Sequence, residues 1–445
     1  MSTDKSSLLV ANSIIRVVGV FETTSKIKSL TAKFTNADYE REIISNPATV
    51  SHFKNYWYPD FRDIYFLKKE ETSAKIFSKK LERKIDFVVR TNRETGDQTI
   101  LNATLNSAEL FLFEGQLNFF TIELSIEEKQ LTAYSDLTYC ARNFDSLVKG
   151  EDNDVKWVNW IEKNILCGIK ISADSSKSKV KVDDYSGSKF KLFTILDMEQ
   201  TLEQSTRLEL LYDIGCVAPI GSAGGNSPFT PSESYFEELM ENKISVFNNY
   251  DILPLFDSFT VIGNQLLDPN PQHFKNITWS QSYFRIYIHN LFIKFNLFRY
   301  NSGMVNDSVT VRDEFETFLN NYNLSHISYN FLPNLMYHKH RISLDIDAEL
   351  EKFQDRINRI SQAILEEKQS RSNLLLGIVG LVTSLSSIEP VLAGIHDFQK
   401  YTGLDSGFYY SLIAILVISG GTPLLMYLFP DKTKQIKRKW RERKN

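Results

Sequence analysis

A glycine-rich loop, residues 221–227, is the first stretch whose residue types could do chemistry. Such a loop can wrap a phosphate group with its backbone N–H groups. The candidate ligand residues in it are Gly221, Ser222, Gly224 and Gly225. The loop lacks the Gly-Lys-Ser/Thr ending of a P-loop, and it is not a Gly-x-Gly-x-x-Gly sequence after a clear strand. We therefore favour the other interpretation, a linker between two domains.

The histidines and cysteines show no catalytic or metal-binding spacing. His338 and His340 are two residues apart, which places them on different faces of a helix, and His289 lies in an aromatic run typical of a core. The three cysteines have neither metal-ligand nor redox spacing, so we expect buried thiols in a reducing compartment. A His-Glu-x-x-His motif and a nucleophile elbow are both missing from the sequence. We therefore do not expect an enzyme.

Small and hydroxylated residues recur at steps of four and three near the C-terminal end of the chain. They are Asn373, Gly377, Gly380, Ser384 and Ser387. This spacing puts them on one face of a helix. In a membrane helix such a face either packs closely against another helix or lines a narrow, weakly polar pore. Further polar residues off this face favour the pore. Two spans per chain cannot enclose a channel, so a pore requires a homo-oligomer.

One long helix must position that face. Apolar residues alternate in steps of four and three from Ile346 onward, and Pro390 is the first proline after this point. The pattern predicts a stalk helix over residues 343–372 that continues into the first membrane span. Asp345 and Asp347 fall at its start, where acidic side chains favour the positive end of the helix dipole.

Two membrane spans are predicted at residues 373–395 and 408–429, with an outer loop at 396–407 between them. The tail, residues 430–445, carries eight basic and two acidic residues. The positive-inside rule then places both termini in the cytoplasm, in a multi-pass protein that contacts membrane lipids. The chain carries a net charge of −4, so the part before the tail carries about −10. This acidic remainder argues against a nucleic-acid polymer as a partner.

The soluble part is predicted to have an α+β fold in two domains. Residues 1–220 form an α/β domain and residues 221–342 a mainly helical domain. The predicted strands are 14–21, 85–90, 99–105 and 190–196, together with a hairpin formed by 108–113 and 116–124. The predicted helices are 147–163, 199–212, 235–247, 279–300 and 309–324.

This layout resembles the CorA family of two-span, pentameric metal-ion transport proteins. The resemblance lies in the long helix that enters the first span, the short outer loop, the second span and the aromatic-then-basic ending around Tyr427 and Trp440. The resemblance implies a funnel-shaped homo-pentamer in the bacterial inner membrane. It also implies a possible regulatory Mg²⁺ site at Asp345 and Asp347, although helix initiation is the interpretation we favour for these residues.

One departure from the family concerns its Gly-Met-Asn signature, which this sequence lacks. The nearest match is Gly403-Leu404-Asp405, with Tyr401 before it in the outer loop. Divergent CorA-like proteins without this signature are encoded beside type III CRISPR systems and are switched by a nucleotide second messenger of the adenylylated S-adenosylmethionine (SAM-AMP) type. The resemblance therefore implies a nucleotide-gated antiviral effector. The alternatives are a Mg²⁺ transporter with a degenerate selectivity loop and a membrane-anchored scaffold without a pore.

Overall fold

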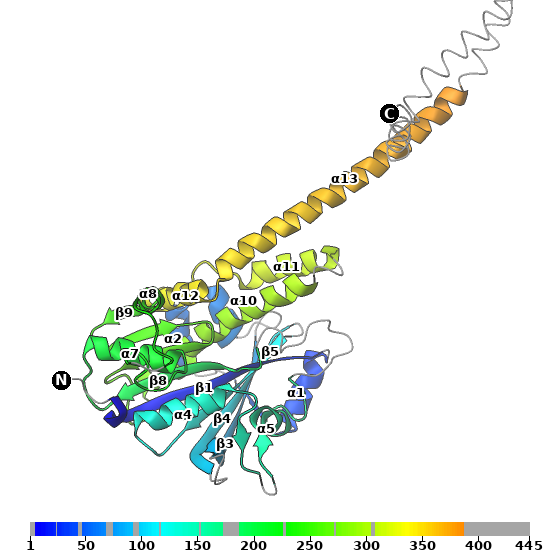
Figure 1. Ribbon diagram of the computed structural model, residues 1–445. Coiled ribbons are helices and arrows are strands. Elements are labelled where there is room, and N and C mark those ends of the chain that lie inside the picture. Colours follow the sequence, from blue (N-terminus) through cyan, green and yellow to red (C-terminus); the bar gives the residue numbers. More distant parts are fainter. Residues whose placement is uncertain are drawn as a thin grey trace, which may run out of the picture. The chain divides into compact units, whose positions relative to one another are not determined.

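The computed structural model describes most of the chain up to residue 386. The described residues are 5–23, 25–42, 47–67, 74–91, 98–114, 117–150, 153–171, 187–225, 228–270, 273–303 and 308–386. The chain divides into two units, Met1–Phe353 and Gln354–Asn445. The first unit is an α+β domain built on a mixed sheet (Figure 1), which confirms the predicted fold class of the soluble part.

The sheet of the first unit contains 11 strands among the described residues. Its strands are β1 (Val10–Glu22), β2 (Glu40–Arg41), β3 (Lys75–Thr91), β4 (Gln98–Leu112), β5 (Leu117–Ser125), β6 (Leu147–Val148), β7 (Val155–Lys156), β8 (Lys191–Met198), β9 (Ile244–Phe247), β10 (Tyr250–Pro254) and β11 (Ser258–Gly263). Their order is β7-β6-β3-β4-β5-β1-β8-β11-β10-β9, and β2 pairs with β3. The β8–β11 pair is parallel, and the other pairs are antiparallel.

The centre of the sheet is buried on both faces, because its strands are almost continuously apolar. All eight residues of β8 and all six of β11 are buried. The hairpin of β4 and β5 confirms the prediction for residues 108–124, with Leu112 opposite Asn118 at its turn end. At the middle of β1, Gly19 is required by packing, because a Cβ there would lie 2.2 Å from the Phe120 ring.

Helices cover both faces of the sheet. The helices of the described chain are η1 (Lys5–Ser7), α1 (Ile27–Thr35), α2 (Pro47–Tyr56), α3 (Pro59–Arg62), η2 (Asp63–Leu67), α4 (Leu131–Arg142), α5 (Trp157–Asn164), α7 (Gln204–Gly215), α8 (Glu233–Met240), α9 (Phe274–Ile277), η3 (Thr278–Tyr283), α10 (Phe284–Gly303), α11 (Ser308–Tyr322), α12 (Phe331–Ser343) and α13 (Ile346–Ser386). Figure 1 shows α10, α11 and α12 together on one side of the sheet and α1, α4 and α5 on the other.

Aromatic side chains fill the layer between the sheet and α10. Phe113 of the β4–β5 turn stacks on Phe292 of α10 with ring centres 3.9 Å apart. Phe193 of β8 contacts Phe284 edge to face at 5.0 Å. Every large apolar side chain at the sheet-facing positions of α10 is buried, which confirms the predicted aromatic core helix at 279–300. Such packing holds α10 firmly on the sheet.

The structure corrects three element predictions. The helix expected at 235–247 ends at Met240, and residues 244–247 form strand β9 instead. The helix expected at 147–163 begins only at Trp157, after the short strands β6 and β7. The region 221–342 is not mainly helical throughout, because β9, β10 and β11 belong to the same sheet as residues 10–198. The structure therefore places the two predicted soluble domains in one unit that extends to Phe353.

The predicted stalk appears as one continuous helix. α13 contains 41 residues and begins at Ile346, with Asp347 and Glu349 in its first turn. This position agrees with helix initiation by acidic residues, the interpretation favoured from the sequence. Residues 387–445 lie outside the described part of the chain.

Candidate functional site

The glycine-rich loop encloses a carboxylate of the protein itself. Asp213, at the end of α7, is fully buried. Its Oδ2 accepts a hydrogen bond from the Gly221 N–H at 2.7 Å, and its Oδ1 accepts one from the Ala223 N–H at 2.8 Å. The backbone thus forms the anion-binding nest suggested by the sequence, with Asp213 as its occupant.

Burial dominates the electrostatics of this nest. It raises the pKa of Asp213 to about 6, although the two backbone N–H groups and Lys5 act in the opposite direction. Lys5 also donates to the Ala223 carbonyl at 2.8 Å and pairs with Glu209. Gly224 adopts a φ of +72°, and a Cβ there would lie 2.9 Å from Glu209. The loop is therefore a structural turn of the α+β unit that holds Asp213. Ligand binding by this loop stays a prediction.

The junction between α12 and α13 is the second candidate site. The chain turns at Asp345, whose φ of +52° lies in the left-handed region. Leu344 and Ile346 on either side are fully buried. Further along α13, Phe353 packs edge to face on Phe315 of α11 at 4.4 Å. The first two turns of α13 are thus anchored in the core of the first unit.

Polar contacts clamp the same junction. Lys294 of α10 donates to the Leu344 carbonyl and to Glu349, both at 2.7 Å. Arg341 of α12 donates from Nε to Asp347 at 3.1 Å. We call these contacts, made by Lys294 and Arg341 to residues 344–349, the α13 clamp. Charge-assisted hydrogen bonds from partly buried donors are stronger than neutral ones, so the clamp fixes how α13 leaves the unit.

A second contact set ties the junction to the sheet. Ser343 donates from its hydroxyl to the Pro254 carbonyl at 2.7 Å, and Asn242 donates to the same carbonyl at 3.0 Å. Pro254 ends β10 and begins the loop that leads into β11. The end of α12 is therefore bonded directly to a strand end, which links sheet geometry to the start of α13.

The two acidic residues proposed for a regulatory cation do not form a metal site within the described residues. Asp347 pairs with Arg341, and Asp345 is an exposed turn residue. No group of three or more His, Cys, Asp or Glu side chains in the described ranges could hold a metal ion. A cation bound between copies of the chain stays a prediction.

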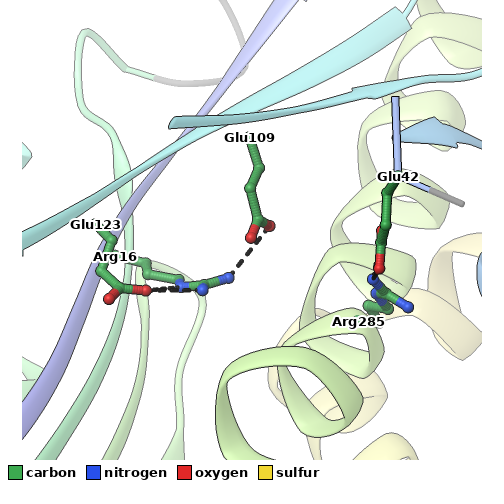
Figure 2. A network of polar contacts seen from close by, with 5 residues as sticks. All are labelled: Arg16, Glu42, Glu109, Glu123 and Arg285. Atoms are coloured by element: carbon green, nitrogen blue, oxygen red, sulfur yellow. Dashed lines mark hydrogen bonds and ion pairs between the residues drawn. The ribbon is translucent and has the colours of Figure 1, made fainter. Parts of the chain in front are cut away.

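A charged network lies beneath α10, where sequence reasoning proposed no site. Arg16 of β1 is buried and donates to Glu123 of β5 at 2.7 and 2.9 Å and to Glu109 of β4 at 3.2 Å (Figure 2). Burial alone would lower the pKa of Arg16, but Glu109 and Glu123 raise it. For Glu109, burial raises the pKa even though Arg16 opposes this. The network therefore keeps its arginine charged inside the protein.

Arg285, at the start of α10, continues this network. It donates to both oxygens of Glu42 at 2.7 Å (Figure 2). It also donates to the Tyr65 carbonyl at 3.2 Å. Its guanidinium also lies 4.6 Å from the centre of the Phe66 ring. Both arginines are thus fully engaged by protein groups, which favours a structural role in joining sheet, helix and the η2 segment.

One sequence signal could have revealed this network. Arg16, Glu109 and Glu123 are each a charged residue inside an otherwise apolar predicted strand. A charge at a buried strand position needs a partner on a neighbouring strand. The signal identifies the residues, but their pairing depends on strand order, which the sequence pattern does not give.

Two histidines, His289 and His340, are buried in the core of the first unit. His289 is fully buried; it donates from Nε2 to the Tyr322 carbonyl at 3.0 Å and accepts from the Tyr65 hydroxyl at 3.1 Å. Burial lowers its pKa to about 3, so it is neutral. The interpretation of His289 as a satisfied core histidine is confirmed. His340 is also buried and stacks on Tyr287 with ring centres 4.9 Å apart.

The cysteines are all free thiols. Cys140 is buried, and burial together with the nearby Asp136 raises its pKa to about 12. Cys167 and Cys216 are half-buried, and burial raises the pKa of each. All three thiols are therefore poor nucleophiles at neutral pH. The expectation of buried thiols is confirmed for Cys140, whereas Cys167 and Cys216 are only half-buried.

The predicted pore face lies partly within the described chain. Asn373, Gly377, Gly380 and Ser384 fall on α13, so their backbone positions share one helix face as predicted. Ser387 and the outer-loop residues lie outside the described residues; the latter are Tyr401, Gly403, Leu404 and Asp405. None of the helices in the described part of the chain has the length and apolar character of a membrane span. Both the pore lining and the spans stay predictions.

Comparisons with known proteins give no relative to guide the assignment. No protein-family model, curated protein or solved structure matches this chain. A functional proposal must therefore come from the residues and from the geometry of the α+β unit.

Proposed function

We propose that this chain is a CorA-like, membrane-anchored homo-oligomer in which the α+β unit controls a pore through α13. The observation that carries the proposal is the α13 clamp. A helix that starts in a charged, buried junction and continues unbroken to Ser386 can transmit a change in the unit along its length.

The surface of α13 supports a membrane role for its C-terminal part. Leu374, Leu375, Leu376, Ile378 and Val379 are between 42% and 66% exposed. Large apolar side chains on all sides of a helix are typical of a helix buried in protein or lipid. In the proposed assembly, lipid and neighbouring copies of α13 cover these side chains.

The pore is the proposed output of the assembly. Asn373, Gly377, Gly380 and Ser384 form its lining on α13, and the basic tail holds both termini in the cytoplasm. The activating ligand is a nucleotide second messenger of the SAM-AMP type, which rests on the resemblance alone. The proposed biological role is that of an antiviral effector in the bacterial inner membrane.

Ion flux from liposomes tests this proposal. Purified full-length protein is reconstituted into vesicles loaded with an ion-sensitive dye, with and without the nucleotide. We expect nucleotide-dependent flux that Gly380→Leu abolishes by filling the small-residue face. The matched control is Val379→Leu, which enlarges the neighbouring residue on another face and should leave flux intact.

Three results would contradict the proposal. Absence of flux under any ligand would favour the scaffold. Magnesium flux that needs no nucleotide would favour the transporter. Unchanged flux in Gly380→Leu would show that this face does not line the pore.

A further inference from the structure

A cluster of basic side chains gathers at the N-terminal end of β8. We call Arg142, Lys189, Lys191 and Lys294 the basic cluster. Lys191 donates to Asp257 at 2.5 Å, and Arg142 pairs with the other oxygen of the same carboxylate. The Lys191 and Lys294 ammonium groups lie 3.7 and 5.5 Å from the centre of the Phe256 ring. Lys189 lies in the same small cavity wall as Lys191.

Among the described residues, the basic cluster carries more positive charge than the carboxylates paired with it neutralise. Four cations face two carboxylates, those of Asp257 and of Glu349, which pairs with Lys294. Burial lowers the pKa of Lys191, and Arg142 and Lys189 lower it further, although Asp257 opposes this. Burial alone would raise the pKa of Asp257, but Lys191 and Arg142 bring it below its usual value. The excess charge at this surface favours a bound anion.

Two buried donors beside Asp257 also lack an acceptor. The Arg142 Nε–H and the Tyr287 hydroxyl are buried and have no hydrogen-bond partner among the described residues. Asp257 and Arg142 both act on the pKa of Tyr287, after the main effect of burial, so its hydroxyl lies close to them. Unsatisfied buried donors are rare in folded proteins, because each costs about 1–3 kcal/mol. Their presence together at one place points to a missing acceptor.

The cluster reaches the surface through Lys189, whereas Lys191 is buried and the side chains of Arg142 and Lys294 are largely covered. The pairing of β1 with β8 ends where Val18 lies opposite Lys191, the first residue of β8. From there β1 continues to Glu22 without β8 beside it. A cavity with room for about one water molecule opens here, lined by Lys189 and Lys191 among aromatic side chains. Lys189 is exposed, and Phe256 is 41% exposed. The cavity itself is too small for a ligand, so an anion would lie at its mouth against the basic side chains.

We propose that the basic cluster binds a phosphate group and that binding loosens the α13 clamp. Phosphate carries several negatively charged oxygens, so more than one cation of the cluster can share it. The Lys294 ammonium lies near the same Phe256 ring as Lys191 and also pairs with Glu349 of α13, so an anion that attracts Lys294 competes with Glu349. The anion-binding site does not depend on the proposed function. The role of this site in gating does rest on the proposed function.

Binding of inorganic pyrophosphate to the full-length protein in detergent tests the site. We expect saturable binding by calorimetry that weakens as salt is raised, because salt screens the charges. Lys189→Ala should weaken it roughly fivefold, the order expected for one exposed charge. Lys28→Ala, which removes an exposed lysine of α1, is the matched control and should not change it. No saturable binding, or equal binding in the two variants, would overturn the site.

Two further measurements test the link to α13. Glu349→Gln should tighten pyrophosphate binding severalfold, because the residue at position 349 then carries no negative charge to compete with pyrophosphate for Lys294. Pyrophosphate should also speed amide hydrogen exchange of residues 346–353 in the unaltered protein. Unchanged affinity and unchanged exchange would refute the link. Neither measurement uses a membrane, so a failure of ion flux and a failure of anion binding can be told apart.

Discussion

The buried carboxylate in the glycine-rich loop makes the sharpest test of the structure. Asp213 has a pKa of about 6 in the folded protein, against 3.8 for an ordinary aspartate. A raised carboxyl pKa means that ionisation disfavours the folded state. The stability associated with a protonated Asp213 is therefore fully present below about pH 4 and is lost as the pH rises through about 6.

The size of this effect follows from the shift. About 2 pKa units correspond to about 3 kcal/mol of unfolding free energy. Unfolding entropy is about 2.1 cal/mol/K per residue, so a unit of roughly 350 residues changes its melting temperature by about 4 °C for that free energy. Asp213→Asn cannot ionise and should lack this pH dependence.

The assay compares melting temperatures of the two proteins in detergent between pH 4 and pH 7.5, followed by tryptophan fluorescence. We expect the melting temperature of the unaltered protein, relative to Asp213→Asn, to fall by about 4 °C across this range. Other titrating groups, including buried His289, contribute equally to both proteins and cancel. Lost hydrogen bonds in the variant add a constant offset that does not depend on pH.

The opposite result, a melting temperature of the unaltered protein that rises relative to Asp213→Asn as the pH rises, would refute this reasoning. It would mean that the N–H groups of Gly221 and Ala223 stabilise the carboxylate by more than burial destabilises it. The loop would then be a strong anion site rather than a costly one.

Three other substitutions test separate parts of the structure. Lys294→Met removes the donor to the Leu344 carbonyl and to Glu349, so it should cost about 1–2 kcal/mol and speed hydrogen exchange in residues 346–353 about tenfold; unaltered exchange there would argue against the α13 clamp. Gly19→Ala places a methyl group against the Phe120 ring and should destabilise the unit by about 1–3 kcal/mol, measured as a lower melting temperature. Ser232→Ala removes the N-cap of α8 and should cost about 1 kcal/mol, whereas Ser234→Ala, in the first turn, removes only a hydroxyl contact to Ser232 and should have a smaller effect on the melting temperature.

The sequence predicted those elements that are determined by residues close together in the chain. The hairpin at 108–124 was predicted from two apolar runs on either side of a turn. The aromatic helix at 279–300 was predicted from the helical spacing of its apolar residues. The start of α13 was predicted because acidic residues precede a sustained apolar stripe. The helix at 235–247 was predicted too long, because the residues after Met240 pair with β10, a contact that only the sheet supplies.

The candidate sites depended more strongly on tertiary structure. The glycine loop was recognisable, but Asp213 as its occupant was not, since that residue lies on the preceding helix. The α13 clamp joins α10 to a turn 50 residues later in the chain, and the basic cluster joins α4, β8 and α10. Such pairs follow from strand order and helix packing, which periodicity alone does not determine.

The parallel pairing of β8 with β11 has a consequence for synthesis of the chain on the ribosome. β8 is complete at Met198, but its second neighbour is made only when Gly263 has been added. Until then one edge of a strand that is buried in the folded protein stays open to pairing with other nascent chains. An expression fragment that stops at residue 220 would carry this open edge permanently and should aggregate, whereas one that reaches Phe353 contains β11 and closes the edge.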